Sequence, residues 1–284
     1  FQWTGNIVLN VPTNTRYKGV YMIKKIASIS FVITLLVALC VPALAMTNES
    51  TPAVSTSVKK TCPVDHCEYT ATASVWVDPD VSFEGSYVGG SSQIYSSNYS
   101  SGQNIPAGYM GVYARVYVND SLRSSSGWTY NTGKGNAMGT STGVFDVFLN
   151  PAEGIVFSQG KFALYNGNGY NEYSTNRTPS LDVSRITPAS ARAAVSAPIE
   201  GTVETNSAGQ TYGSGWLNPD LIEAIGVNGV HGYVLADELD AVGKKTSPDD
   251  EVSIPSTIPL YAEDGVTVIG AFKVGPSQST EYSR

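Results

Sequence analysis

The alternation of side chains in residues 111–118 constrains the fold more than any other feature of the chain. Residues of one kind occupy every second position, so two distinct faces result. One face holds Val112, Ala114, Val116 and Val118, and the other holds Tyr113, Arg115 and Tyr117. A period of two is that of a β-strand. The segment therefore predicts a strand with one face against a core and the other in water.

Comparable short stretches rich in Val, Tyr and Phe recur up to about residue 183. They are residues 73–77, 109–118, 142–149 and 155–165. Clusters of Gly, Ser, Asn and Pro separate them, as expected for turns between strands. Asn119 and Asp120, residues 131–136 and residues 166–169 supply residue types that tolerate a positive φ.

No segment between Thr70 and Val183 shows a sustained helical period. The sequence therefore predicts a mainly β fold, with an antiparallel, jelly-roll-like β-sandwich over residues 71–183. Residues 184–205 predict a linker with a short helix, in which Thr187 is the N-cap and Pro188 is the first helical residue, before Pro198 stops it. Residues 206–284 predict a small β-rich C-terminal unit.

The first 45 residues predict export rather than folding. Lys24 and Lys25 precede an apolar run over residues 26–41, and the small-residue tripeptide Ala43-Leu44-Ala45 follows. This order is typical of a secretory signal peptide over residues 22–45. The run has 16 residues, fewer than the roughly 20 that a spanning helix needs. We therefore expect a secreted or cell-surface protein with no membrane span after cleavage.

Residues 1–21 precede this signal and begin with Phe1. The codons of residues 18–22 can be written as a purine-rich ribosome-binding sequence before an ATG, which favours an untranslated leader over residues 1–21. A real N-terminal extension is the alternative. Acylation of Cys40 is a second alternative for the signal, although Leu39 stands where lipid-attachment signals have a small residue.

Charge narrows the choice of partner. Cleavage after Ala45 would leave 239 residues and lower the net charge from −7 to −11, because the removed part holds four basic residues and no acidic one. Nucleic acids and anionic lipids bind clustered Lys and Arg. The sequence therefore argues against both as partners, and its length suits one large or two modest domains.

Two cysteines lie in a polar arm over residues 46–70. Cys62 and Cys67 are five positions apart, with Pro63 between them, and in an oxidising compartment this pattern predicts a disulfide that closes a small loop. A metal site with Cys62, His66 and Cys67 as ligands is the alternative. Zinc sites need further ligands on a scaffold, and the only other histidine is His231. No cofactor or metal is predicted.

Within the C-terminal unit, Asn228-Gly229 predicts a hairpin turn, residues 232–235 a strand and residues 236–239 a single helical turn. Residues 221–227 suit a helix or a strand. The run Asn228-Gly229-Val230-His231-Gly232-Tyr233-Val234, followed by Glu238-Leu239, resembles the closing part of bacterial SH3-like domains.

The longer tail, with residues 218–221 and 258–272, is similar to C-terminal extensions of secreted or membrane-anchored proteins of Gram-positive bacteria, some of them BlaR-type sensor metallopeptidases. Residues 105–109 and 165–170 resemble secreted Gram-positive proteins of unknown function. The resemblance implies an SH3-like element and makes peptide or cell-wall binding at the envelope plausible. It does not imply peptidase activity, because the chain contains no His-Glu-x-x-His motif.

Signals for catalysis are sparse. His66 and His231 have no recognisable nucleophile or base beside them. A β-sandwich glycosidase needs two facing carboxylates, and the candidates are Asp78, Asp80, Glu84, Asp146 and Glu153. Residues 78–80 and 249–251 could offer oxygens to calcium, but without the spacing of a known calcium loop. The sequence favours a protein that is not an enzyme.

Aromatic and amide side chains gather at the predicted turns. The candidate binding residues are Trp128, Tyr130, Tyr165, Asn168, Tyr170 and Tyr173. Flat rings offer apolar faces to sugars or prolines, and Asn bonds to hydroxyls. Tyrosines that only cap the core are the competing interpretation, and Phe157 and Phe162 are assigned to the core.

Together these features predict a secreted, non-enzymatic protein that binds an extracellular or cell-envelope partner, either a glycan or a protein. Replacing Trp128 or Tyr170 with Ala should then weaken binding with little change in thermal stability. The alternatives are a carbohydrate-active hydrolase on the sandwich and a bacteriocin-like effector.

Overall fold

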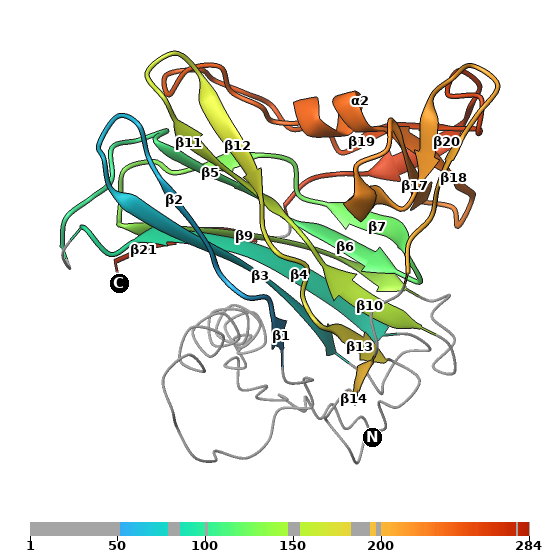
Figure 1. The fold of residues 1–284 in the computed structure, drawn as a ribbon, viewed down its shortest axis with the longest axis horizontal. Helices are drawn as coiled ribbons and strands as arrows, with labels where there is room; N and C mark the ends of the chain where they lie inside the picture. The colour runs from blue at the N-terminus through green and yellow to red at the C-terminus, as the bar shows by residue number, and fades with distance from the viewer. Residues whose placement is uncertain are drawn as a thin grey trace, which may run out of the picture. The chain divides into compact units, whose positions relative to one another are not determined.

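Strands dominate the computed structural model, which describes residues 52–78, 86–99, 102–146, 154–182, 194–196, 200–276 and 278–283 (Figure 1). The expected leader and signal peptide lie outside the described residues. Three sheets, built almost entirely from antiparallel pairs, confirm the predicted mainly β fold with a sandwich architecture. The described residues contain no helix of the length and apolar character needed to cross a membrane.

The first layer is a six-stranded sheet with three long central strands. Its strands are β1 (Ala53–Val54), β2 (Val58–Thr61), β3 (Glu68–Asp78), β4 (Ser86–Ser96), β9 (Ala137–Asp146) and β21 (Gln278–Tyr282). The order is β1-β3-β4-β9-β21, and β2 also pairs with β3. Strand β21, the most C-terminal strand of the described residues, is therefore an edge of the first layer.

The second layer contains a four-stranded sheet in the order β12-β11-β5-β8. Its strands are β5 (Met110–Tyr113), β8 (Thr129–Tyr130), β11 (Lys161–Tyr165) and β12 (Tyr170–Ser174). At Ala114 the chain passes from this sheet into a larger, 11-stranded one, and at Gln159-Gly160 it passes from the larger sheet back into this one. The predicted strand over residues 111–118 is thus two strands, β5 and β6, in two sheets.

The larger sheet joins the rest of the second layer to the C-terminal strands. Its path includes β14 (Ala194–Ser196), β13 (Ser180–Asp182), β10 (Ile155–Ser158), β6 (Arg115–Val118) and β7 (Ser121–Ser125). It continues through β17 (Leu221–Ile225), β18 (His231–Leu235), β19 (Thr257–Tyr261) and β20 (Val268–Lys273). The hairpin of β15 (Val203–Thr205) and β16 (Thr211–Gly213) adds to β17. Parallel pairing of Ala224 with Leu122 joins β17 to β7.

Several local predictions for the C-terminal residues are confirmed. The predicted strand over residues 232–235 is part of β18, and Gly229 has φ 73° in the turn that joins β17 to β18. Of the helix or strand that residues 221–227 suited, the structure has a strand over residues 221–225. A short helix, α2 (Ala236–Ala241), follows β18. A one-turn 3₁₀ helix, η2 (Gly215–Leu217), lies between β16 and β17. In the predicted linker with a short helix, residues 194–196 instead pair with β13 as a strand, and residues 183–193 and 197–199 lie outside the described ones.

Two clusters of apolar side chains lie between the layers. One contains Val75, Val77 and Val88 with Val116 and Val156. The second contains Tyr69 and Ile94 from the first layer with residues of β5 and β11, including Val112 and Phe162. The assignment of Phe162 to the core is thereby confirmed.

A third cluster lies on the opposite face of the second layer, against the C-terminal strands. It contains Tyr113, Tyr117 and Phe157 together with Ile222 and Leu260. The prediction of a wet face for residues 111–118 is therefore wrong, and Arg115 is only 3% exposed. Alternation predicts two unlike faces, but it cannot show that later strands cover the more polar one.

Candidate functional site

Four tyrosine rings follow one another from the interior toward the surface, and we call them the tyrosine row. Ring centroids are 4.9 Å apart for Tyr130 and Tyr170, 5.6 Å for Tyr170 and Tyr165, and 5.5 Å for Tyr165 and Tyr109. Tyr130 is 9% exposed, whereas the other three are half-buried. The row therefore ends in rings that solvent can reach.

Glycines and backbone carbonyls hold these rings in place. Tyr130 lies in the edge strand β8, opposite Gly111 of β5, and a Cβ at Gly111 would lie 2.7 Å from the Tyr130 ring. The Tyr170 hydroxyl donates to the carbonyl of Gly108 at 2.6 Å, and that of Tyr165 donates to Gly167 at 3.1 Å. The rings are thus positioned by the fold before any partner arrives.

Trp128 continues the row inward and is not a surface residue. Its ring lies 6.1 Å from that of Tyr130 and 5.4 Å from that of Tyr113, and the residue is 1% exposed. The prediction that Trp128 can be replaced at little cost in stability is therefore wrong. The indole of Trp128 lies in the core next to α2. The composition of the turn gave no sign that this side chain would be buried.

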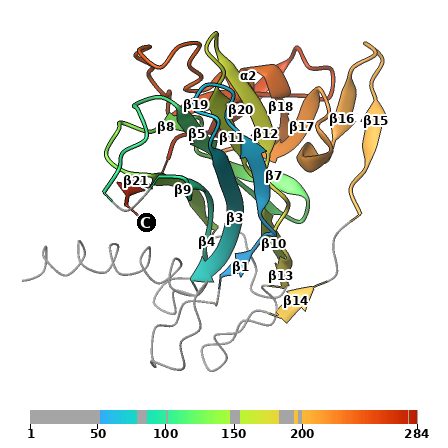
Figure 2. The same ribbon diagram turned by 60° about the vertical axis from the view of Figure 1, so that its left-hand side comes forward.

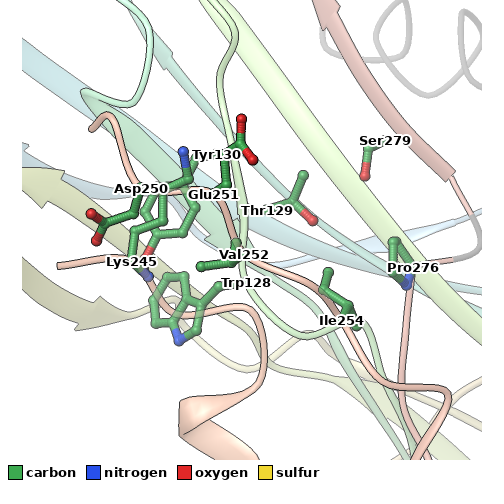
Figure 3. Close-up of a pocket in the computed structure, with 10 residues that line it drawn as sticks. All are labelled: Trp128, Thr129, Tyr130, Lys245, Asp250, Glu251, Val252, Ile254, Pro276 and Ser279. Carbon is green, nitrogen blue, oxygen red and sulfur yellow. Dashed lines mark hydrogen bonds between the residues drawn. The ribbon is translucent and has the colours of Figure 1, made fainter. Parts of the chain in front are cut away.

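A depression of about 490 Å³ opens beside the inner end of the row (Figure 3). Trp128, Tyr130 and Lys245 lie on one side of it, and Pro276 and Ser279 lie on the other. The segment that contains Val252 and Ile254 also lines it.

Lys245 and Asp250 shape the rim of this depression. The Lys245 ammonium donates to the carbonyl of Pro248 at 3.0 Å and lies 5.7 Å from the Tyr130 ring centroid. Asp250 accepts from the backbone N–H groups of Thr246 and Ser247 at 2.7 and 2.9 Å. These bonds, with that from the Thr246 hydroxyl, lower the pKa of Asp250. The carboxylate is thus engaged in holding its own turn.

The hydroxyl groups of Tyr130 and Tyr170 stay neutral. Burial raises the pKa of Tyr130, and burial together with the neighbouring Tyr130 and Asp250 raises the pKa of Tyr170. A phenol with a raised pKa stays protonated at neutral pH. It can then donate and accept hydrogen bonds, but it cannot act as a base. The row is therefore suited to binding through ring faces and hydroxyls.

The structure brings together Trp128, Tyr130, Tyr165 and Tyr170 of the six predicted binding residues. Asn168 is exposed at the tip of the β11–β12 hairpin, where its N–H donates to Asn166 Oδ1 at 2.9 Å. Tyr173 lies away from the row, against Phe162 at 5.2 Å and beneath the Lys60 ammonium at 5.0 Å.

Sequence reasoning missed Tyr109 and Lys245 as members of this site. Tyr109 lies directly before β5, and its carbonyl accepts from the Tyr165 N–H at 2.9 Å. Its place beside a turn was visible in the sequence, but the pairing of β5 with β11 that joins it to Tyr165 was not.

The predicted disulfide is not present: Cys62 and Cys67 are free thiols. Cys62 follows β2 and Cys67 precedes β3, and the Cys62 N–H donates to the Cys67 carbonyl at 2.9 Å. The side chains bond elsewhere, from Cys62 Sγ to the carbonyl of Tyr165 and from Cys67 Sγ to that of Asp65, each at 3.4 Å. Burial raises the pKa of both thiols.

The same hairpin loop does not gather metal ligands. Within the described ranges, no three His, Cys, Asp or Glu side chains are placed to hold a metal ion. Asp65 instead accepts from the hydroxyls of Tyr69 at 2.7 Å and Tyr99 at 3.0 Å. The His66 side chain is exposed.

The carboxylates considered for hydrolysis give no site that can be described. Asp78 ends β3 and Asp146 ends β9. Asp80, Glu84 and Glu153 lie outside the described residues. A facing pair among them stays a prediction.

A buried ion-pair group lies beneath the inner end of the row. Asp240 of α2 binds both Arg115 of β6 and Lys161 of β11. Burial and the nearby Arg115 lower the pKa of Lys161, although Asp240 opposes this. Both basic side chains pair with Asp240, so the group joins α2 to the second layer.

Comparison of the chain with protein-family models, with curated proteins and with solved structures found no match. The case for a function therefore rests on the residues and geometry described above.

Proposed function

We propose that this protein is a secreted, non-enzymatic binding protein whose tyrosine row holds a glycan of the cell envelope. The row carries the proposal: Tyr130, Tyr170, Tyr165 and Tyr109 form an unbroken series of contacting rings with an accessible outer end. Export is inferred from the basic residues, apolar run and Ala43-Leu44-Ala45 pattern of the first 45 residues.

Several features support a sugar over a charged ligand. Ring faces pack on the apolar faces of sugar rings, and tyrosine hydroxyls and amides bond to hydroxyl groups. The outer end of the row has both, because Asn166, Asn168 and Asn171 lie in and beside the turn that follows Tyr165. The resemblance of the C-terminal strands to SH3-like domains and to tails of Gram-positive envelope proteins supports the same location.

A sedimentation assay with insoluble cell-wall material, followed by a soluble glycan panel, tests the proposal. We expect wild-type protein to sediment with the wall and Tyr165→Ala to lose most of this retention. Tyr165 suits the test because its ring is half-buried at the outer end of the row. Tyr173→Ala is the matched control, since Tyr173 is a half-buried tyrosine of β12 that lies away from the row, against Phe162.

The thermal unfolding temperature of each variant separates loss of binding from loss of fold. Equal retention of folded Tyr165→Ala and wild type would overturn the assignment of the row. Retention that protease treatment of the wall abolishes would identify a protein partner in place of a glycan.

A further inference from the structure

Negative charge is concentrated in the C-terminal strands. Residues 200–272 hold 12 of the 24 acidic residues and only 2 of the 17 Lys and Arg residues of the chain. No Lys or Arg occurs between Arg192 and Lys244. These strands therefore carry a field that attracts cations.

Five side chains from separate elements converge on one outward sheet face, which we call the acidic tyrosine face. They are Glu204 of β15, Tyr212 of β16, Glu223 of β17, Tyr233 of β18 and Glu263 of the β19–β20 turn. The register sets Glu204 beside Tyr212 and Glu223 beside Tyr233. The two tyrosine rings meet edge to face, with centroids 5.5 Å apart and planes at 84°.

The carboxylates act on the same two phenols. The hydrogen bond to Glu204, 2.7 Å long, is the main cause that raises the pKa of Tyr212 to about 12, with smaller contributions from burial and from Glu263. Burial, then Glu223 and Glu263, raise the pKa of Tyr233. The carboxylates of Glu204, Glu223 and Glu263 therefore lie close to the same pair of tyrosines.

No cation of the described residues neutralises these charges. None of the ion pairs formed in the described ranges includes Glu204, Glu223 or Glu263. Tyrosine faces attract ammonium and guanidinium groups, and carboxylates bond to them. The face thus has the chemistry that recognises Lys and Arg.

An open strand edge borders this face. In the described part of the chain β15 pairs only with β16, and Figure 2 shows this hairpin at the outer end of the sheet. Ser214 N–H donates to Thr202 and Asn206 N–H to Gln210, each at 2.9 Å. Residues of an antiparallel strand alternate between bonding to the partner strand and directing their backbone N–H and C=O groups away from it. Because Thr202 and Asn206 bond to the partner strand, Glu204 also bonds to β16. Val203 and Thr205 therefore direct their backbone groups to the open side.

The geometry points to an extended, Lys- or Arg-containing segment of another protein that adds as a strand to β15 and lays its cationic side chains on the acidic tyrosine face. Strand addition supplies backbone hydrogen bonds, and the face supplies selectivity for charge. A second copy of the chain is disfavoured, because pairing two β15 edges would bring like charges together. This site is separate from the tyrosine row and does not depend on its proposed function.

Fluorescence anisotropy with a labelled peptide in which Lys alternates with Thr tests the inference. We expect binding that weakens as salt rises, as for exposed charges. The double variant Glu204→Gln/Glu263→Gln should bind roughly tenfold or more weakly, since it removes two charges that face the peptide. Val203→Pro, which removes an outward N–H, should weaken binding, whereas the matched Val203→Thr should not.

Further measurements distinguish this site from the tyrosine row, strand addition from simple cation attraction, and another protein from a second copy of the chain. Tyr165→Ala should bind the peptide as wild type does, which separates this site from the tyrosine row. Equal affinity of folded wild type and the double glutamine variant would overturn the inference. Unchanged peptide affinity in Val203→Pro, with spermine competing as well as unlabelled peptide, would show simple cation attraction in place of strand addition. Concentration-dependent dimers that Val203→Pro abolishes in sedimentation velocity would show a second copy as the occupant.

Discussion

The indole nitrogen of Trp128 donates a hydrogen bond to the backbone carbonyl of Asp240 at a distance of 3.0 Å. The bond joins the segment before β8 to helix α2, which are far apart in the sequence. Trp128 also packs against Tyr113, whose hydroxyl donates to the carbonyl of Leu239 at 3.1 Å. Two aromatic residues of the second layer therefore hold the end of one short helix.

Trp128→Ala should lower the free energy of unfolding by about 3–5 kcal/mol, because it removes a large buried ring. Trp128→Phe keeps a ring but leaves the Asp240 carbonyl without its donor, at a cost of about 1–3 kcal/mol. Urea unfolding followed by tryptophan fluorescence and circular dichroism measures both. The exposed Leu217 gives a control, and Leu217→Ala should change the free energy by less than about 0.5 kcal/mol. A Trp128→Ala protein as stable as wild type would contradict the core assignment.

Asp240→Asn should destabilise the protein by about 3–5 kcal/mol, because Arg115 and Lys161 would remain buried without their counter-charge. Asp237→Asn is the matched control in the same helix. Asp237 is exposed in the first turn of α2, where its loss should cost at most about 1 kcal/mol. Equal effects of the two substitutions on urea midpoints would show that the buried pair contributes little.

Cys62 and Cys67 should both react with iodoacetamide once the protein is unfolded without reductant, because neither is in a disulfide. In the native state Cys67 should react first, since it is half-buried whereas Cys62 is buried. Both reactions should be slow near neutral pH, because burial raises the pKa of each thiol. Intact mass spectrometry counts the added groups. If the unfolded, unreduced protein takes up no carbamidomethyl groups on Cys62 and Cys67, the two cysteines are bonded in a disulfide and the assignment of free thiols is wrong.

Acid should weaken the β2–β3 hairpin through Asp65. Burial alone would raise the pKa of Asp65, but hydrogen bonds from Tyr69, the Cys67 N–H and Tyr99 outweigh it and lower the pKa. The ionised carboxylate therefore adds stability above its unfolded pKa of about 3.9, and this stability is lost as the pH falls through the lower, folded pKa. Urea unfolding as a function of pH should show a steeper loss below about pH 4 in wild type than in Asp65→Asn. Parallel curves would contradict this role.

Local signals in the sequence predicted several of the strands and turns correctly, although they missed the long strand β4. Asn119 and Asp120 adopt φ values of 48° and 77° in the two-residue turn between β6 and β7, as their side chains favour. Gly229 does the same between β17 and β18. These features depend on a few neighbouring residues, so a single sequence contains the information for them.

Long-range packing was the part that the sequence could not supply. The sequence pattern placed Arg115 on the solvent face of a strand. The residue is buried instead, and Asp240, far along the chain, neutralises its charge. Trp128 reads as a turn aromatic, yet residues 239–242 cover it. Two cysteines five positions apart suggested a disulfide, but each thiol has a carbonyl partner of its own.

In the candidate site, too, local signals were visible in the sequence and long-range packing was not. Composition indicated that tyrosines near turns were available for binding, and Tyr130, Tyr165 and Tyr170 do meet. Tyr173 carried the same signal but lies on the other face of β12, against Phe162. Side-chain direction within a strand alternates, so the register decides which tyrosines meet, and register is a property of the whole sheet.

The position of β21 bears on how the chain is made. Residues Gln278–Tyr282 pair with β9, whose residues were added more than a hundred positions earlier. Synthesis proceeds from the N-terminus, so until the ribosome has passed Tyr282 the growing chain exposes the β9 edge without its partner. An exposed edge of this kind invites pairing with other chains. The β9 edge of a nascent chain is therefore open to such pairing until residues 278–282 have emerged from the ribosome and paired with it.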